Sequence, residues 1–441
     1  MRIQMQGRGI RAVLKTTVLL LFFVLAANSL MAAPKAPVFD VITVNATITP
    51  PIAEYIIQSI AEAAQSGAEG LIIRLDTPGG LDLAMRDIAK GILNAPIPVI
   101  VYVAPAGARA ASAGVIITIS AHIAAMAPGT NIGAAHPVGL GIGGTMDKTM
   151  SAKVENDAVA YVQGIAKKRG RNEEWVAKAV RKSESITAEE ALRLKVIDMV
   201  ATDTSQLLAQ ADGREVSLAG GKRVLRTHGA LLREKEMGSR QKILSALSDP
   251  NIAYILLLIG LAGLYFEFST PGVILPGVIG GISLIMAFFA MQTLPVNYAG
   301  IALIIFSIIL FIAEVKVVSH GILTVGGVVS LIIGSLMLFE TPDPSLRISL
   351  SVLIPAVTVT SLFFIAIIVI AVRSQLRKTQ GGKEGMAGEE GTAVTDIFEE
   401  GKVLIHGEYW SAVSNVPVIK GAQVRVVRVE QLKVRVEPIE K

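Results

Sequence analysis

The 441-residue chain contains no cysteine, so thiol catalysis, disulfide bonds and thiolate metal sites are excluded together. It has only five histidines, and none of them stands at a tight metal-ligand spacing: His122, His136, His228, His320 and His406. A zinc or haem site is therefore not expected, and we predict no cofactor. Charged residues make up 17% of the chain, and the net charge of +5 is scattered, which gives no reason to expect a nucleic-acid partner.

Hydrophobic residues, in contrast, make up 52% of the chain, which is typical of a protein in the lipid bilayer. Five apolar runs in residues 250–373 predict a transmembrane region of about five helices, although the first four are close to the lower length limit for crossing a bilayer. These runs are Ile252–Phe268, Val273–Met291, Tyr298–Ala313, Ile322–Phe339 and Leu350–Val372.

The N-terminus has the pattern of a secretory signal peptide, with basic residues before the apolar run Thr17–Ala27 and small residues after it. We expect residues 1–33 to be this signal, cleaved near Ala32 or Ala33, or else to be an uncleaved anchor. In both cases the next domain is exported. Basic residues also follow the last apolar run, from Arg373 to Lys378, and an odd number of spans would place them in the cytoplasm. We therefore expect an inner-membrane protein with its N-terminal domain outside.

Residues 34–203 alternate short apolar strands with amphipathic helices, which indicates a mostly parallel α/β layer. The expected strands are Val38–Val44, Leu71–Leu75, Val99–Val103 and Ile123–Ala127. The glycine-rich segment Gly139–Gly144 interrupts the pattern and is expected to form a mobile loop. Residues 204–249 are polar, and we interpret them as a short strand pair plus a linker.

A second linker, residues 374–390, leads to five alternating runs in residues 391–441, which predict a small all-β barrel of the OB type. Such barrels often bind single-stranded nucleic acid through aromatic side chains and basic grooves. Here Tyr409 and Trp410 are the only strong aromatic pair, and interleaved glutamates offset the basic residues. We therefore favour a protein-contact role for this barrel.

Two motifs in the N-terminal domain follow expected strands and point to acyl transfer. Ala110-Ala111-Ser112-Ala113-Gly114 places a serine among small residues at a helix start, about thirty residues after Asp76-Thr77-Pro78-Gly79-Gly80. The serine is a candidate nucleophile, and backbone N–H groups of both motifs are candidates for an oxyanion hole. The alternative is that the small residues only permit helix packing and the glycines only form a turn.

The spacing of residues in the sequence does not identify the general base that would activate this serine. Asp76 fits a turn cap better than a base, and His136 precedes a proline in a loop of small residues, where shaping the pocket is the commoner role. Lys153, with Lys148 as a second choice, would need its pKa lowered by about three units from ~10.4, roughly 4 kcal/mol of desolvation. Asp157, one helical turn later, would oppose that shift by pairing. Spacing alone does not separate Lys153 from a solvated surface lysine.

Residues 37–203 resemble the protease domain of the long NfeD-type membrane proteins, which are related to ClpP and signal peptide peptidase A. Multi-span helices and an OB barrel follow in that family too. The Asp-x-Pro-Gly-Gly run alone is shared with crotonase-fold enzymes. The runs that carry the resemblance are Leu75–Leu81, Gly107–Gly114, Asn131–Val138 and Lys153–Ala158.

This resemblance implies a Ser–Lys dyad at Ser112 and Lys153, with an oxyanion hole formed by the N–H groups of Gly80 and Ala113. Supporting roles would fall to Asp76, Gly79 and His136. It also implies an endopeptidase that cleaves hydrophobic segments of membrane proteins, with a stomatin-like (SPFH) protein as partner.

We therefore predict a ClpP/crotonase-like α/β domain, a transmembrane helix bundle and an OB-type barrel, with the activity of a membrane-bound serine endopeptidase. We expect a homo-oligomer. One alternative is a crotonase-type acyl-CoA enzyme, which the export signal disfavours because coenzyme A is a cytosolic cofactor. The other is a non-catalytic scaffold that organises membrane microdomains.

Overall fold

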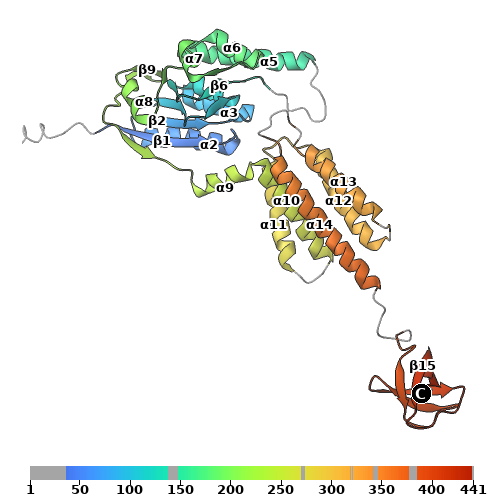
Figure 1. Ribbon diagram of the computed structural model, residues 1–441. Helices are drawn as coiled ribbons and strands as arrows, with labels where there is room; N and C mark the ends of the chain where they lie inside the picture. The colour runs from blue at the N-terminus through green and yellow to red at the C-terminus, as the bar shows by residue number, and fades with distance from the viewer. Residues whose placement is uncertain are drawn as a thin grey trace, which may run out of the picture. The chain divides into compact units, whose positions relative to one another are not determined.

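The computed structural model describes residues 36–137, 148–269, 274–317, 319, 321–339, 341, 346–376 and 385–439. An N-terminal α/β domain, a group of apolar helices and a C-terminal barrel follow one another along the chain (Figure 1). The expected signal peptide and the glycine-rich segment 139–144 lie outside the described residues.

The α/β domain is built on a six-stranded parallel sheet with the strand order β11-β1-β2-β3-β5-β8. Each of the four strands expected from the sequence is present in it. Burial of both faces explains why β3 is a continuous apolar run and why β2 is apolar except for the partly buried Arg74 and Asp76. The strands are β1 (Val38–Asn45), β2 (Gly70–Asp76), β3 (Val99–Val103), β5 (Ile123–Met126), β8 (Met199–Val200) and β11 (Leu231–Glu234).

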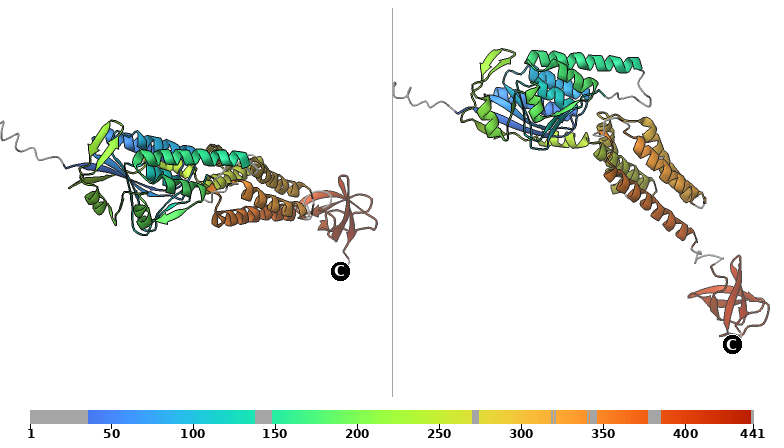
Figure 2. Two further views of the ribbon diagram at one scale, coloured as in Figure 1. Left: turned by 90° about the horizontal axis from the view of Figure 1, so that it is seen from above. Right: turned by 45° about the horizontal axis from the view of Figure 1, so that its top comes forward.

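Helices cover both faces of this sheet (Figures 1 and 2). One face packs on α2 (Pro50–Gln65), α3 (Asp82–Leu93), α4 (Ala113–Ser120), α5 (Lys148–Arg169) and α6 (Glu173–Arg181). The other packs on α8 (Thr204–Ala211) and on the strand pair β9 (Glu215–Leu218) and β10 (Gly221–Val224). In α2, the apolar positions one turn apart are buried as predicted, among them Ile52, Ile56 and Ile60.

The segment 204–249 is more than the strand pair and linker expected from the sequence. The pair β9–β10 is present, but β11 joins the main sheet beside β1, and α9 (Ser239–Leu247) follows it. The Arg233 guanidinium on β11 donates to both carboxylate oxygens of Asp40 on β1, at 2.6 and 3.0 Å. Because Asp40 is buried, this ion pair satisfies a carboxylate that would otherwise be costly inside the sheet. The fold of the α/β domain therefore extends past residue 203.

A second, smaller sheet was not expected from the sequence. Its strands β4 (Arg109–Ala111), β6 (Asn131–Gly133) and β7 (Ser185–Thr187) have three residues each, too short for a recognisable alternation. Strand β7 leads directly into α7 (Ala188–Arg193), where Thr187 and Glu190 form the predicted capping box. Strand β4 ends at Ala111, the residue before Ser112.

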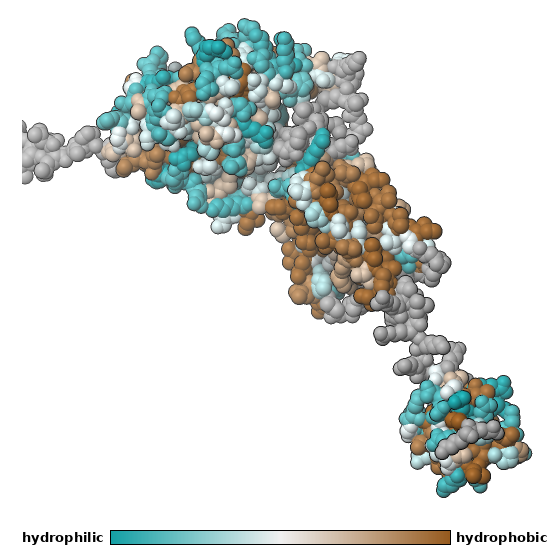
Figure 3. Space-filling model, viewed as in Figure 1, coloured by the Kyte–Doolittle hydropathy of each residue, from teal (hydrophilic) through white to brown (hydrophobic). Residues whose placement is uncertain are grey.

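Five apolar helices occupy the positions of the five expected runs, namely α10 (Pro250–Ser269), α11 (Ile274–Met291), α12 (Tyr298–Lys316), α13 (Ile322–Met337) and α14 (Leu350–Leu376). Their surface is largely hydrophobic, unlike that of the α/β domain (Figure 3). Three of them, α10, α11 and α14, are long and apolar enough to cross a membrane. The apolar parts of α12 and α13, Tyr298–Glu314 and Ile322–Met337, are shorter, so a count of five spans stays a prediction.

Glycines let α10 and α11 approach closely. A β-carbon at Gly263 would lie 2.7 Å from the Cα of Gly280, so both positions need a residue without a side chain. Elsewhere in the apolar part, the Tyr254 hydroxyl hydrogen-bonds Ser335 at 2.8 Å, and Phe311 stacks on Phe364. The helices divide between two compact units of the chain, with the breaks inside α12, α13 and α14.

The C-terminal region is a closed five-stranded barrel with the order β12-β13-β14-β16-β15, as predicted. Alternate side chains of each strand fill its interior, mostly valine and isoleucine. The strands are β12 (Glu390–Ala393), β13 (Gly401–Ile405), β14 (Glu408–Ser414), β15 (Gln423–Glu430) and β16 (Lys433–Pro438).

Candidate active site

Ser112 stands between β4 and α4 in a backbone conformation that few side chains adopt. Its φ of 51° and ψ of −111° put a non-glycine residue in a region that costs about 1–3 kcal/mol. The Ser112 N–H donates to the Gly133 carbonyl at 3.1 Å, and the Ser112 carbonyl accepts from Val115 N–H at 3.0 Å. These bonds fix the turn on both sides of the serine, so that its side chain lies at the N-terminus of α4.

Helix packing also requires a small residue after Ser112. A β-carbon at Gly114 would lie 2.8 Å from the Thr77 side chain and 3.2 Å from that of Ala110, so α4 can start here only with glycine at this position. The packing interpretation and the catalytic one are therefore compatible. The same close approach brings the Asp76–Gly80 turn next to the serine.

The turn that contains Gly79 and Gly80 lies against Ser112, and Gly80 lines the pocket. The Gly79 carbonyl accepts from Ile48 N–H at 2.7 Å, and the Leu81 N–H donates to the Ile48 carbonyl at 2.9 Å. A β-carbon at Gly79 would lie 2.8 Å from the β-carbon of Ser112, and one at Gly80 would lie 2.2 Å from the Ile48 oxygen. Both glycines also have positive φ, 133° and 154°. Only glycine fits at either position.

Among the hydrogen bonds of the described residues, the backbone N–H groups of Gly80 and Ala113 have no acceptor. Both residues line the same pocket as Ser112. Ala113 is the first residue of α4, whose N-terminal N–H groups have no carbonyl partner inside the helix. The pair of free donors beside a serine is the arrangement that stabilises an oxyanion.

The pocket measures about 560 Å³ and also takes in Lys153 and His136. Its wall is mainly apolar, with side chains from α3, α4, α5 and α6, among them Met85, Ile116, Val154, Val162 and Val180. The structure thus brings Ser112, Lys153, Gly80 and Ala113 to one cavity with His136. It also leaves room beside them for an apolar side chain.

Lys153 lies in the second turn of α5 and is exposed. Among the described residues, no carboxylate forms an ion pair with it. The expected competitor, Asp157, is instead bound to Arg86, whose Nη2 lies 2.6 Å from its Oδ2. The side chain of Lys148, the second choice of base, lies outside the described residues.

His136 and Asp76 each form a hydrogen bond with a backbone group. The Nδ1 of His136 donates to the Val180 carbonyl at 2.8 Å, which fixes the ring against the pocket wall. The Asp76 carboxylate accepts from the Arg109 N–H at 3.0 Å, as a turn cap would, and does not line the pocket.

Sequence reasoning did not find Arg86. It lies one turn after Asp82 on α3 and binds that carboxylate at 2.8 Å as well as Asp157, and its guanidinium lies over the Tyr161 ring, 4.4 Å from the centroid. The spacing of Asp82 and Arg86 is the usual one for a pair on a helix surface and was available as a signal. The link to Asp157, seventy-one residues later, was not.

Comparison with known proteins covers almost all of the chain. Residues 38–218 match the NfeD1b N-terminal domain, residues 251–370 the NfeD integral membrane domain, and residues 383–438 the NfeD-like C-terminal, partner-binding domain. The membrane-bound protease PH1510 of Pyrococcus horikoshii is 38% identical over 384 residues, which cover 85% of this chain and 87% of that protein. This chain belongs to the NfeD family. The resemblance inferred from the sequence is therefore confirmed.

Solved structures match the N-terminal domain. Two of them are mutants of the 1510-N membrane-bound stomatin-specific protease, both 35% identical to this chain. The serine-to-alanine mutant covers 46% of this chain and 100% of its own, with a TM-score of 0.44. The lysine-to-alanine mutant, in complex with a substrate peptide, covers 48% and 97%, with a TM-score of 0.45. ClpP1 of Listeria monocytogenes is 19% identical, covers 38% and 94%, and has a TM-score of 0.31. The predicted fold class, a ClpP-like domain followed by apolar helices and a small barrel, is confirmed.

Proposed function

We propose that this chain is a membrane-bound serine endopeptidase in which Ser112 is the nucleophile and Lys153 is the general base. The observation that carries the proposal is the pocket itself, where Ser112 and Lys153 lie beside the unpartnered N–H groups of Gly80 and Ala113. The family relationship supports it, because a relative across most of the chain is a membrane-bound protease. The serine and lysine mutants of the 1510-N protease fit the same pair of residue types.

In the proposed mechanism, the neutral amine of Lys153 takes the proton from the Ser112 hydroxyl as its oxygen attacks the scissile carbonyl. The N–H groups of Gly80 and Ala113 donate to the oxyanion that forms. The Lys153 ammonium then gives its proton to the leaving amine, which departs as the new N-terminus and leaves an acyl-Ser112 ester. A water molecule, deprotonated by Lys153, hydrolyses the ester and restores the serine.

The pocket wall supports hydrophobic segments as the substrate class. Met85, Ile116 and Val154 offer apolar surface beside the serine, and burial of an apolar side chain contributes about 25 cal/mol per Å². The related 1510-N protease is specific for a stomatin homolog. We therefore propose a stomatin-like membrane protein as the substrate or partner of this chain.

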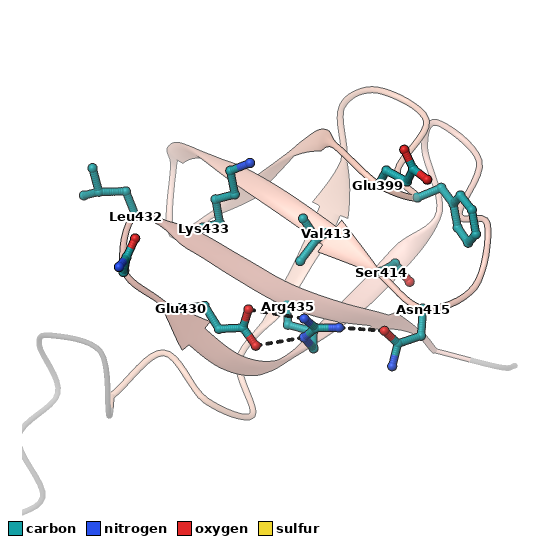
Figure 4. Close-up of a pocket in the computed structure, with 10 residues that line it drawn as sticks. Glu399, Val413, Ser414, Asn415, Glu430, Leu432, Lys433 and Arg435 are labelled. Atoms are coloured by element: carbon teal, nitrogen blue, oxygen red, sulfur yellow. Dashed lines mark hydrogen bonds and ion pairs between the residues drawn. The ribbon is translucent and has the colours of Figure 1, made fainter.

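The barrel supports a contact with that partner, in keeping with the family description of a partner-binding domain. A wide groove of about 990 Å³ runs between the loop before β13 and the turn before β16. Leu432 is 82% exposed at one end of it (Figure 4). Phe398, which also lines the groove, is half-exposed. Arg435 on the floor is bound by Glu430 and Asn415, so the groove offers apolar contacts and few free charges. We propose that it holds an apolar segment of the partner.

We propose an orientation in the inner membrane with the α/β domain outside and the barrel in the cytoplasm. It rests on the expected export signal, on an odd number of spans and on the basic residues that follow α14.

The catalytic proposal is tested with the detergent-solubilised full chain and a hydrophobic peptide. Ser112→Ala and Lys153→Ala should each abolish cleavage, and the double variant should be scarcely worse, because a nucleophile and its base act as a unit. Lys153→Arg should also be inactive, since a guanidinium does not lose its proton in this range. His136→Ala should keep a measurable fraction of activity. Circular dichroism of each variant checks that it remains folded.

The pH dependence provides a separate check. The value of kcat/KM should rise with pH as the base loses its proton. Full activity in Lys153→Ala, with loss in His136→Ala, would assign the base to the histidine. Full activity in Ser112→Ala would exclude this site as the protease centre and favour the scaffold alternative.

A further inference from the structure

Arg86 connects the helix that follows the oxyanion-hole turn with the helix that carries the proposed base. It belongs to α3, which starts at Asp82, two residues after Gly80, and its guanidinium binds Asp157 on α5 at 2.6 Å. The same guanidinium binds Asp82 at 2.8 Å and lies over the ring of Tyr161 on α5. Three contacts of one side chain, with Asp82, Asp157 and Tyr161, therefore converge on the rim of the pocket.

Asp157 is the carboxylate best placed to pair with Lys153. Residues four apart on a helix lie on one face with their β-carbons about 5–6 Å apart, and oppositely charged side chains at that spacing attract each other. Lys153 and Asp157 both line the pocket. A carboxylate paired with the Lys153 ammonium would favour the protonated form, which cannot accept the serine proton.

We propose that Arg86 is a positioning residue for the dyad: by binding the Asp157 carboxylate, it prevents an Asp157–Lys153 ion pair and so leaves the Lys153 amine free to lose its proton. This inference rests on the proposed function, since it needs Lys153 as the base. It assigns the Arg86–Asp157 pair a role in the pH dependence of cleavage rather than in folding. The Asp157 side chain is 67% exposed and that of Arg86 is 32% exposed, and ion pairs that solvent reaches in this way contribute little to stability.

The other charged and titratable groups around Lys153 do not replace Arg86. Among the described residues, those that line the pocket are Asp82, Arg86, His136, Asp157 and Tyr161. Asp82 is bound by Arg86, and His136 is bound to a backbone carbonyl. Glu155, on the neighbouring turn of α5, faces Arg181 of α6 at 3.8 Å. Within the described part of the pocket, Arg86 is thus the one cation other than Lys153 that is placed to bind Asp157.

The test is the pH midpoint of kcat/KM, measured on the detergent-solubilised full chain with a hydrophobic peptide. Arg86→Gln removes the cation and leaves the Asp157 carboxylate free to pair with Lys153, so the midpoint should rise by about 0.3 to 1 pH unit. In the double variant Arg86→Gln/Asp157→Asn, the midpoint should return toward the wild-type value. Asp82 is present in both variants, so the difference between them isolates Asp157.

Three further variants distinguish the proposed role from a merely structural effect. Arg86→Lys keeps a cation for Asp157 and should keep the midpoint closer to wild type than Arg86→Gln does. Arg193→Gln breaks a comparable exposed pair with Glu190 on α7 and should leave the midpoint unchanged. Asp157→Asn alone leaves Arg86 intact and should lower the midpoint or leave it unchanged, a test that does not depend on how well Arg86→Gln folds.

The inference is overturned if Arg86→Gln has the wild-type midpoint, if the double variant keeps the midpoint of Arg86→Gln, or if Asp157→Asn raises it. Failure of the proposed function gives a different result, because Ser112→Ala would then remain active whatever the midpoints are. A loss of kcat/KM in Arg86→Gln without a shift in midpoint would assign Arg86 to packing of α3 on α5 and would also reject the proposal.

Discussion

Replacement of Gly80 by alanine should remove most of the peptide cleavage, because the structure has no room for a β-carbon at this position. That atom would lie 2.2 Å from the Ile48 carbonyl oxygen and 2.5 Å from the Ile48 nitrogen, whereas ordinary contact begins at 3.4 Å. The Gly80 backbone must therefore move by about 1 Å away from Ile48. The φ of 154° adds backbone strain to this clash.

A shift of this size removes one of the two proposed oxyanion donors from reach, since such donors act at 2.7–3.1 Å. Loss of a single donor costs about 100- to 1,000-fold in kcat, or about 2.7–4 kcal/mol of transition-state stabilisation. KM should change much less, because the negative charge is present only in the transition state and the intermediate.

The matched control is Gly213→Ala. Gly213 also has a positive φ, 73°, but a β-carbon there meets no atom within 4 Å. It follows α8 and does not line the pocket, so this variant reports the cost of backbone strain alone, about 1 kcal/mol. Both variants are assayed as full chains in detergent for kcat, KM and thermal midpoint. Wild-type kcat in Gly80→Ala would refute the reasoning, and an equal loss in Gly213→Ala would show that general destabilisation is the cause.

Three other predictions concern different parts of the chain. Burial and the nearby cations Arg169 and Arg171 lower the pKa of His122 to about 3. Between pH 6.5 and 3 the unfolded chain therefore binds one more proton than the folded chain, and the free energy of unfolding falls as the pH drops through that window. His122→Asn should make this fall in thermal midpoint shallower, and an unchanged slope would contradict it. A reporter that works only in the cytoplasm should be active when fused to Lys441, and silence there, with activity from a reporter restricted to the outside, would indicate an even number of spans. Leu432→Lys should weaken binding of a stomatin-like protein in pull-down, whereas Val427→Lys, which is exposed outside the groove, should not.

The sequence predicts those strands and helices whose burial is reflected in the apolar pattern of their own residues. Strand β3 is a continuous apolar run, and β2 is mostly apolar, because both faces of these strands are covered. The barrel strands alternate because only one of their faces is covered. The apolar helices follow from composition alone. In each case a window of five to twenty residues contains the whole signal.

The pairing of strands that lie far apart in the sequence leaves no such local pattern of apolar residues. All four residues of β11 are exposed, and two of them are charged, so nothing in their pattern indicates a strand at the edge of the main sheet. Its place beside β1 depends on Arg233 meeting the buried Asp40, almost two hundred residues earlier. Strands β4 and β6 have only three residues each, so their pairing beside the Ser112 turn is recognised from the structure and not from the sequence.

The candidate site shows the same division between local and distant information. Small residues around Ser112 and the paired glycines at 79 and 80 are visible in the sequence, because both features arise from steric demands on adjacent residues. Lys153 is an exposed lysine on a helix that carries several others, and its local sequence even contains a carboxylate at the spacing that favours pairing. Only the fold shows that this carboxylate is already bound to Arg86. The residues beside Lys153 therefore argue against the proposed base, and the contact between Arg86 and Asp157 argues for it. This is why the pH midpoint of Arg86→Gln tests the proposed site more directly than any inspection of the local sequence.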